Sequence, residues 1–154
     1  QILEQVGPVR FFSVDGGHWK SIVHNDLSLA ERTLASAGVI ALDDYFRAEW
    51  PEVTHGYALW QAETTSDIVP FAVGSNKLYL CRKDHTPRYR AALLRSPFLR
   101  YYFRKSYRTE NGELDCYRVE PFKQDEESAA RAIIFSFGIF RPDLFIALRS
   151  WLRK

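Results

Sequence analysis

The sequence predicts an α/β fold, in which a parallel strand–helix–strand unit precedes an antiparallel hairpin and a mostly helical C-terminal extension. Two short apolar runs, at 9–15 and 39–46, both contain aspartate at their ends, and the residues between them have the apolar spacing of an amphipathic helix. Two further apolar runs flank a short turn that contains Gly74. The first unit implies a right-handed parallel crossover and the second an antiparallel pair, so together they predict a mixed sheet.

The elements of the first crossover follow from periodicity and from glycine positions. Residues 9–15 indicate a buried strand, which two glycines interrupt. A helix is predicted over 19–36, and Gly38 has the position of a residue that ends it. The second buried strand follows at 39–46. Short connections of this kind are typical of a βαβ unit.

The hairpin and its preceding helix occupy the middle of the chain. Pro51 is well placed to begin a helix over 52–64, because proline is favoured in the first helical turn. Strands are predicted at 70–73 and 77–82, on either side of the Gly74–Asn76 turn. An antiparallel pair at this point would complete the sheet begun by the crossover.

The chain divides into a first region at 1–83 and a second region at 84–154. The second region is predicted to contain helices at 87–105, 125–137 and 142–153, with one strand at 114–119. The charge balance changes sign at this boundary. Residues 1–81 contain five basic and ten acidic side chains, and residues 82–154 contain sixteen basic and nine acidic ones.

The segment 82–108 is basic and rich in aromatic residues, with nine basic side chains and a single acidic one. Such a segment can bind nucleic acid, lie on an anionic membrane together with 142–154, or pack on its own domain. Packing is the favoured interpretation, peripheral membrane contact is second, and nucleic acid is the least favoured partner.

Composition excludes several classes of protein. The 154 residues are 46% hydrophobic and 26% charged, as in ordinary globular proteins, so disorder is excluded for most of the chain. No apolar run is long enough to span a membrane, and the first residues do not resemble a signal peptide. Cys81 and Cys116 fall in strand-like runs and are interpreted as reduced core residues, which favours a cytoplasmic protein.

Three carboxylates follow the two strands of the crossover. Asp15 ends the first strand, and Asp43 and Asp44 lie near the end of the second. The carboxyl ends of parallel strands share one edge of a sheet, so these acids are expected to converge there. A divalent cation such as Mg²⁺ would offset their repulsion. Alternatively, the acids cap the helices that follow or bind loop amides.

The loop after the first strand contains three further candidates. His18 is placed to act as a general base, because histidine exchanges protons near neutral pH, although a lone histidine is more often structural. Trp19 offers a flat surface on which a heterocycle could stack, or it packs as a partly buried aromatic residue. Lys20 follows directly.

The order of these segments resembles a known enzyme family. The run FFSVDGGHWKSIVHNDLSLAERTLASAGVIALDDYF resembles the fourth strand, following helix and fifth strand of class I S-adenosylmethionine-dependent methyltransferases. It looks most like the metal-dependent O-methyltransferases of the macrocin and macrolide type, and PFAVGSNKLYLCR is similar to the closing antiparallel pair of that fold. The resemblance covers about residues 8–83 and implies the half-fold of a Rossmann-like methyltransferase.

The resemblance also implies roles for individual residues. Asp15 would be a metal ligand near the cofactor, and Asp43 and Asp44 would complete a Mg²⁺ site. His18 would be the general base, with Lys20 as the alternative base. The cofactor S-adenosylmethionine would contact a set of residues after the first strand, namely Asp15, Gly16 and Trp19. The implied reaction is metal-assisted methylation of a hydroxyl group on a sugar or another small metabolite.

The N-terminal part of the sequence differs from the family pattern. Methyltransferases of this class have a glycine-rich loop after their first strand and an acid after their second, and neither has a counterpart in residues 1–154. We therefore expect this chain, which begins at Gln1 and contains no methionine, to be a C-terminal piece that is inactive when isolated. Strand 9–15 would then present an unpaired apolar edge, which predicts a homo-oligomer or a rearranged sheet.

Two other functions remain open at this point. The chain could be a non-catalytic, methyltransferase-like module for oligomerisation or scaffolding, which the missing glycine-rich loop favours. It could also belong to another Mg²⁺-dependent α/β enzyme, such as a sugar-nucleotide transferase, because a pair of acids after a strand is common in such enzymes.

Overall fold

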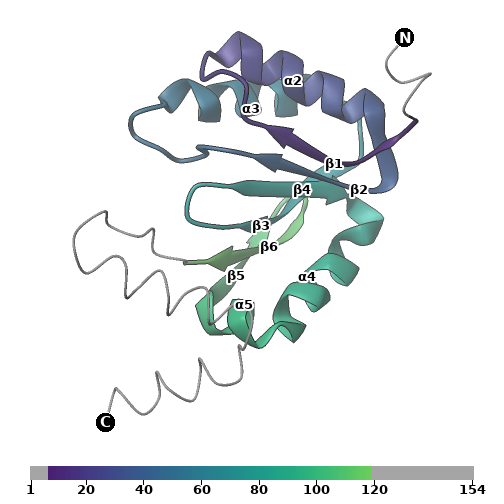
Figure 1. Ribbon diagram of the computed structural model, residues 1–154, viewed down its shortest axis with the longest axis vertical. Helices are drawn as coiled ribbons and strands as arrows, with labels where there is room; N and C mark the ends of the chain where they lie inside the picture. Colours follow the sequence, from purple (N-terminus) through teal and green to yellow (C-terminus); the bar gives the residue numbers. More distant parts are fainter. Residues whose placement is uncertain (1–6, 119–154) are drawn as a thin grey trace.

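The computed structural model describes residues 7–118 and has an α/β architecture built on one mixed sheet (Figure 1). The strand order within these residues is β1-β2-β4-β3-β6-β5. The strands are β1 (Val9–Val14), β2 (Leu34–Leu42), β3 (Ile68–Val73), β4 (Leu78–Arg82), β5 (Phe103–Thr109) and β6 (Gly112–Tyr117). The helices are α2 (Lys20–Thr33), α3 (Pro51–Glu63), α4 (Thr86–Arg95) and α5 (Pro97–Tyr102), with a single 3₁₀ turn, η1 (Lys83–His85), before α4.

The parallel crossover predicted from the sequence is confirmed, although its internal boundary is different. Strands β1 and β2 pair in parallel and α2 connects them. The predicted end of the helix at Gly38 is wrong, because α2 ends at Thr33 and Gly38 lies inside β2. A Cβ atom at Gly38 would lie 2.7 Å from the Leu34 side chain and 2.9 Å from the Val9 carbonyl oxygen. This glycine therefore permits the close approach of β1 to β2.

The antiparallel hairpin is also confirmed, and its second strand lies in the interior of the sheet. Strand β4 pairs antiparallel with β3 on one side and with β2 on the other. The turn before β4 therefore lies at the carboxyl end of β2, where the predicted acids are. This placement brings the turn residues into the candidate site described below.

The C-terminal region contains more strand than we predicted. The helix expected at 87–105 is divided at Ser96, whose hydroxyl accepts a hydrogen bond from the Leu99 N–H and so begins α5. Residues 103–109 form β5 instead of continuing the helix, and β6 includes part of the strand predicted at 114–119. Because β6 pairs with β3, the sheet continues across the boundary predicted at residue 83. The helices expected at 125–137 and 142–153 lie outside the described residues.

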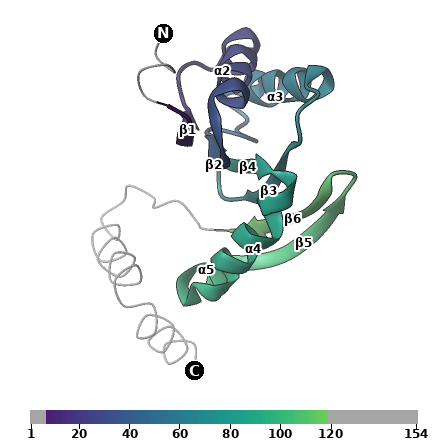
Figure 2. The ribbon, with the colours of Figure 1, turned by 90° about the vertical axis from the view of Figure 1, so that its right-hand side faces the viewer.

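Helices cover both faces of the sheet (Figure 2). Buried side chains of α2 and α3, including Leu27 and Trp60, pack with Ile40 and Leu80 in the larger core. On the other face, residues of α4 and α5 pack against a smaller core that contains Phe71 and Cys81. Burial raises the pKa of the Cys81 thiol to about 12, which agrees with its predicted role as a core residue.

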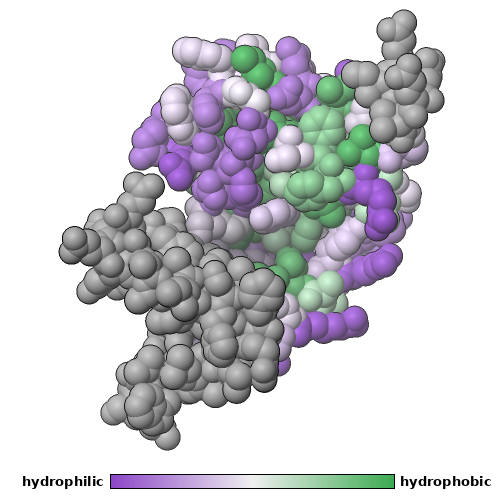
Figure 3. Space-filling view, in the orientation of Figure 1, coloured by the Kyte–Doolittle hydropathy of each residue, from purple (hydrophilic) through white to green (hydrophobic). Residues whose placement is uncertain are grey.

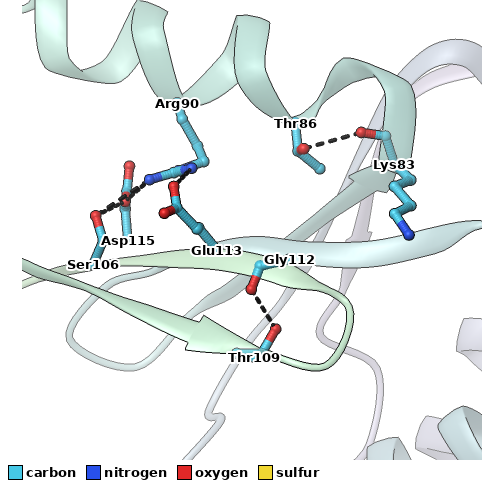
Figure 4. Close-up of polar contacts among 8 residues, drawn as sticks. All are labelled: Lys83, Thr86, Arg90, Ser106, Thr109, Gly112, Glu113 and Asp115. Atoms are coloured by element: carbon cyan, nitrogen blue, oxygen red, sulfur yellow. Dashed lines mark hydrogen bonds and ion pairs between the residues drawn. The ribbon is translucent and has the colours of Figure 1, made fainter.

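A buried polar cluster attaches the β5–β6 hairpin to α4 (Figure 4). Asp115 of β6 is fully buried, and its Oδ1 accepts hydrogen bonds from Arg90 Nη2 at 2.7 Å and from Ser106 Oγ at 2.6 Å. The Arg90 guanidinium also pairs with Glu113. Arg90 Nη2 also donates to Ser106 Oγ of β5 at 3.2 Å, so a single arginine of α4 connects to both strands of the hairpin.

One edge of the sheet, formed by β1, has no neighbouring strand among residues 7–118. Phe11 of this strand is 60% exposed. Figure 3 shows apolar side chains gathered over β1 and β2 on the face turned to the viewer. The predicted unpaired edge is thus present in this part of the chain, while the homo-oligomer expected from it stays a prediction.

The helices of the described region are all too short or too polar to cross a membrane. A cytoplasmic location and a peripheral membrane contact through 82–108 and 142–154 stay predictions from composition.

Replacing Gly56 of α3 with alanine is expected to destabilise the protein. A Cβ atom there would lie 2.7 Å from the Lys20 carbonyl oxygen and 2.8 Å from Val23 Cβ, both on α2. The two helices would have to move apart, so we expect the free energy of unfolding in urea to fall by about 1–3 kcal/mol. In an exposed helix the same substitution would raise it by about 1 kcal/mol.

The exposed Ala58 on the same helix provides the matched control. Ala58→Gly is expected to lower the free energy of unfolding by about 1 kcal/mol, through helix propensity alone. A Gly56→Ala variant that is more stable than the native chain would contradict the close approach of α2 and α3.

Candidate functional site

The candidate site lies at the carboxyl ends of β1 and β2, where the structure brings the predicted acids to one edge. Asp15 directly follows β1, and Asp43 and Asp44 directly follow β2. The Asp43 N–H donates to the Val14 carbonyl oxygen at 3.0 Å, which holds the two strand ends together. The predicted convergence at this edge therefore follows from the parallel register of the two strands.

The Asp43 carboxylate is held by donors from its own chain. Its Oδ1 accepts hydrogen bonds from Asn76 Nδ2 at 2.8 Å and from the Asp44 N–H at 2.9 Å. Its Oδ2 pairs with Lys77 Nζ at 2.5 Å. Asn76 and Lys77 belong to the turn before β4, so the antiparallel insertion of β4 supplies both donors.

The Asp44 carboxylate connects the two strand ends to the loop that carries the predicted base. Its Oδ2 lies 3.0 Å from His18 Nε2, and its Oδ1 pairs with Arg47 Nε at 3.0 Å. Asn76 Nδ2 also approaches Oδ1, at 3.3 Å. The backbone of Asp44 is left-handed, with φ of 51°, a conformation that aspartate adopts more readily than most residues.

His18 has an aromatic neighbour as well as the aspartate. Its ring stacks on the Trp50 ring, with centroids 4.1 Å apart and planes 14° from parallel. An Nε2–H that donates to Asp44 leaves Nδ1 as the nitrogen that can accept a proton. The stack and the hydrogen bond together fix the orientation of the ring.

An open cleft of about 470 Å³ lies beside His18. Its walls come from the loop after β1 and from the segment that leads into α3, namely Gly17, His18, Trp19, Glu49, Trp50, Pro51 and Glu52. The Lys20 N–H donates to Glu52 Oε2 at 2.9 Å, which ties the two segments at the start of α2. Trp19 is 67% exposed at this cleft. The volume is in the range of small-molecule sites.

The structure brings together most of the predicted site residues and adds others. Asp15, His18 and Asp43 line one small hollow between the two strand ends, which adjoins the cleft. Trp19 lines the cleft, and Lys20 begins α2 with its backbone next to Glu52. The residues that sequence reasoning missed are Arg47, Trp50, Asn76 and Lys77. The sequence predicted a hairpin turn at residues 74–76, but the position of this turn at the site depends on the strand order.

The predicted Mg²⁺ site of Asp15, Asp43 and Asp44 coincides with this cluster of paired charges. All four carboxylate oxygens of the aspartate pair already have partners within the protein. Within residues 7–118, no group of three or more histidine, cysteine, aspartate or glutamate side chains is arranged to hold a metal ion. The side chains as arranged do not fit Mg²⁺, so the metal site stays a prediction from the sequence and no step below uses it.

Replacing Asp43 with asparagine is expected to change how stability depends on pH. Burial works to raise the pKa of the Asp43 carboxyl, but the hydrogen bond from Lys77, the Asp44 N–H and the Lys77 charge hold it below its ordinary value. The ionised carboxylate therefore stabilises the fold above about pH 4, and this contribution is lost as pH falls further. The variant should be less stable at pH 7 and lose less stability on acidification, measured by urea unfolding.

Asp84 supplies the control for that experiment, because it is an exposed aspartate outside the cluster. Asp84→Asn is expected to leave the pH dependence of unfolding close to that of the native chain. Identical acid profiles for Asp43→Asn and the native chain would show that the Asp43–Lys77 pair does not contribute.

The site is built from a histidine–aspartate pair, a cluster of paired charges and an aromatic cleft, all at one edge of the sheet. Comparison with known protein families, with curated proteins and with solved structures finds no match for the chain.

Proposed function

We propose that this chain forms the acceptor-side part of an S-adenosylmethionine-dependent O-methyltransferase that acts on a hydroxyl group of a sugar or another small metabolite. The observation that carries the proposal is the pair formed by His18 and Asp44, whose nitrogen and oxygen atoms lie 3.0 Å apart beside the cleft. A histidine oriented by a carboxylate is an arrangement suited to removing a proton from a hydroxyl.

The sheet topology supports the proposal that this is the carboxyl-terminal half of a Rossmann-like methyltransferase fold. The resemblance implies a parallel crossover followed by a closing antiparallel pair. Strands β1 and β2 form such a crossover, and β3 and β4 form such a pair, with β4 next to β2. The further strands β5 and β6 would be an addition to that half-fold.

In the proposed reaction, the protein orients the acceptor and takes up its proton. S-adenosylmethionine would supply an electrophilic methyl group on its sulfonium. His18 Nδ1 would accept the hydroxyl proton as the acceptor oxygen takes the methyl group and the thioether leaves. Asp44 stabilises the imidazolium that results, and the proton then passes to water. Lys20 is the alternative base, because it stands at the start of α2 near the same loop.

The residues after β1 fit the proposed cofactor contacts. Asp15 and Gly16 are exposed at the end of the strand, so their polar groups are accessible to a bound molecule. A Cβ atom at Gly16 would lie 3.0 Å from Asp26 Oδ2, so a larger residue would crowd this loop. The resemblance gives Trp19 a cofactor contact as well, but this exposed side chain lines the cleft beside His18, and we assign its flat surface to the acceptor.

The test measures both ligand binding and turnover. It uses the protein encoded by the whole reading frame that contains these residues, which we call the native protein. Calorimetry with S-adenosylhomocysteine, with and without Mg²⁺, measures cofactor binding. Transfer of a labelled methyl group from S-adenosylmethionine to a set of hydroxylated metabolites measures the reaction. Binding together with transfer is the expected result.

The absence of both binding and transfer would overturn the proposal and favour the scaffold function. Binding of a nucleotide sugar together with Mg²⁺, and not of S-adenosylhomocysteine, would instead favour the sugar-nucleotide transferase.

A further inference from the structure

The cleft beside His18 combines aromatic walls with negative charge. Of the residues that line it, Glu49 and Glu52 are acidic, Trp19 and Trp50 are aromatic, and none is lysine or arginine. Glu52 accepts a hydrogen bond from the Lys20 N–H, whereas Glu49 has no hydrogen bond or ion pair within the described residues. The cleft therefore carries at least one carboxylate without a direct cationic partner among the described residues.

Two basic side chains near the cleft are already engaged, whereas the exposed side chain of Lys20 does not line it. Arg47 pairs with Asp44, and Lys77 pairs with Asp43. Neither guanidinium nor ammonium group lines the cleft. A molecule inside it would therefore experience a negative potential from Glu49 and Glu52, which favours a cation and disfavours a phosphate or carboxylate.

The tryptophans of the cleft also favour a positively charged ligand. Indole faces attract cations, and they also accept the apolar face of a saturated ring. Trp19 is largely exposed, and His18 covers one face of Trp50. A ligand that combines a ring with a positive charge satisfies both the aromatic and the acidic groups of this cleft.

We propose that the acceptor recognised by this cleft carries a protonated amine, and that its class is an amino sugar. This proposal rests on the proposed methyl transfer and deepens it by naming the acceptor class. Glu49 is the residue that sets the preference for charge, while Trp19 and Trp50 provide the surface for the ring. A neutral sugar would bind more weakly, and a sugar phosphate would be repelled.

The test is a titration of the full chain with three sugars that differ in charge. Glucosamine, glucose and glucose 6-phosphate are added at a pH at which the amine is protonated, and the tryptophan indole N–H signals are followed by NMR. We expect the Trp19 and Trp50 signals to shift, with glucosamine bound about tenfold more tightly than glucose. The buried Trp60 indole, which donates to Glu31, is the internal reference.

Two variants that each remove one carboxylate test whether Glu49 sets the preference for a charged sugar. Glu49→Gln is expected to reduce the preference for glucosamine over glucose by about threefold. Glu110→Gln removes an exposed carboxylate of the β5–β6 turn, far along the chain from the cleft, and should leave the preference unchanged. Equal binding of glucosamine and glucose, or equal effects of both variants, would overturn the proposal.

Further arms of the experiment separate this proposal from the proposed function. Shifts of Trp19 and Trp50 with S-adenosylhomocysteine, but not with glucosamine, would show that the cleft takes the adenosyl group and would overturn the acceptor assignment alone. Methyl transfer by the native protein to neutral sugars only would do the same. Glucosamine binding without any cofactor binding or methyl transfer would overturn the proposed function and leave an amino-sugar site.

Discussion

Replacement of Asp115 with alanine is expected to lower the free energy of unfolding by about 3–5 kcal/mol, a large part of the stability of a domain this size. Asp115 is fully buried and accepts hydrogen bonds from Arg90 and Ser106 (Figure 4). Without it, the Arg90 guanidinium, which is itself mostly buried, keeps the exposed Glu113 as its one charged partner among residues 7–118. The loss arises mainly from a charge left without its buried partner, and urea unfolding measures it.

Two further variants distinguish the effect of an unpaired buried charge from a general loss of stability. Arg90→Met combined with Asp115→Leu removes both charges and should recover much of the loss, because an apolar pair leaves no buried charge uncompensated. Asp67→Ala breaks the Arg82–Asp67 pair, which has a comparable 2.6 Å distance but is exposed, and should cost less than about 1 kcal/mol. Equal losses at Asp67 and Asp115 would contradict the importance of burial.

Replacement of His18 with glutamine is expected to lower the kcat of methyl transfer in the native protein by about 100-fold or more. Glutamine can still hydrogen-bond to Asp44, but it cannot take up a proton from the acceptor hydroxyl. Binding of S-adenosylhomocysteine should change by less than about twofold, because the lost group acts on the proton and not on the cofactor. Turnover and calorimetry on the same preparation measure the two quantities.

His24 is the matched control for this experiment. Its Nε2 lies 2.8 Å from Glu63 Oε2, so it also forms a histidine–carboxylate pair, but it does not line the cleft. His24→Gln should leave kcat within about twofold of the native value. Native turnover in the His18→Gln variant would show that His18 is not the general base and would favour Lys20 in that role.

The crossover and the hairpin were predictable because their signals are local. The apolar run before Asp15, the helical spacing that follows and the turn around Gly74 each lie within a few residues of the structure they specify. The boundary between α2 and β2 was not predictable in this way. Gly38 has the usual position of a helix-ending residue, and its place in a strand depends on the pairing of β2 with β1 and β4, which are distant in the sequence.

Strand β5 could not be found from its pattern. All but one of its side chains are exposed, so the alternation that marks a half-buried strand is missing. The strand forms because it pairs with β6, and the sequence between Phe103 and Thr109 alone does not carry that information. The preceding aromatic and basic residues therefore resembled the continuation of a helix.

The site was predictable in its acids and not in their partners. Asp15, Asp43 and Asp44 could be placed at one edge because parallel strands align their carboxyl ends. Asn76 and Lys77 reach the same edge only because β4 lies between β2 and β3, which is a property of strand order. These two side chains donate to the Asp43 carboxylate, which the sequence alone had suggested as a ligand for a cation. They therefore offset negative charge at this edge of the sheet.

The attachment of the β5–β6 hairpin has a consequence for the order in which the protein unfolds. Backbone pairing joins β6 to the rest of the sheet at only two positions, Ala72 with Asp115 and Val73 with Cys116. The hairpin can therefore open as a cooperative unit at lower free energy than the six-stranded sheet as a whole. Backbone amides of β5 and β6 would then exchange with deuterium before those of β2 and β4, and the Arg90 cluster would set the free energy of that opening.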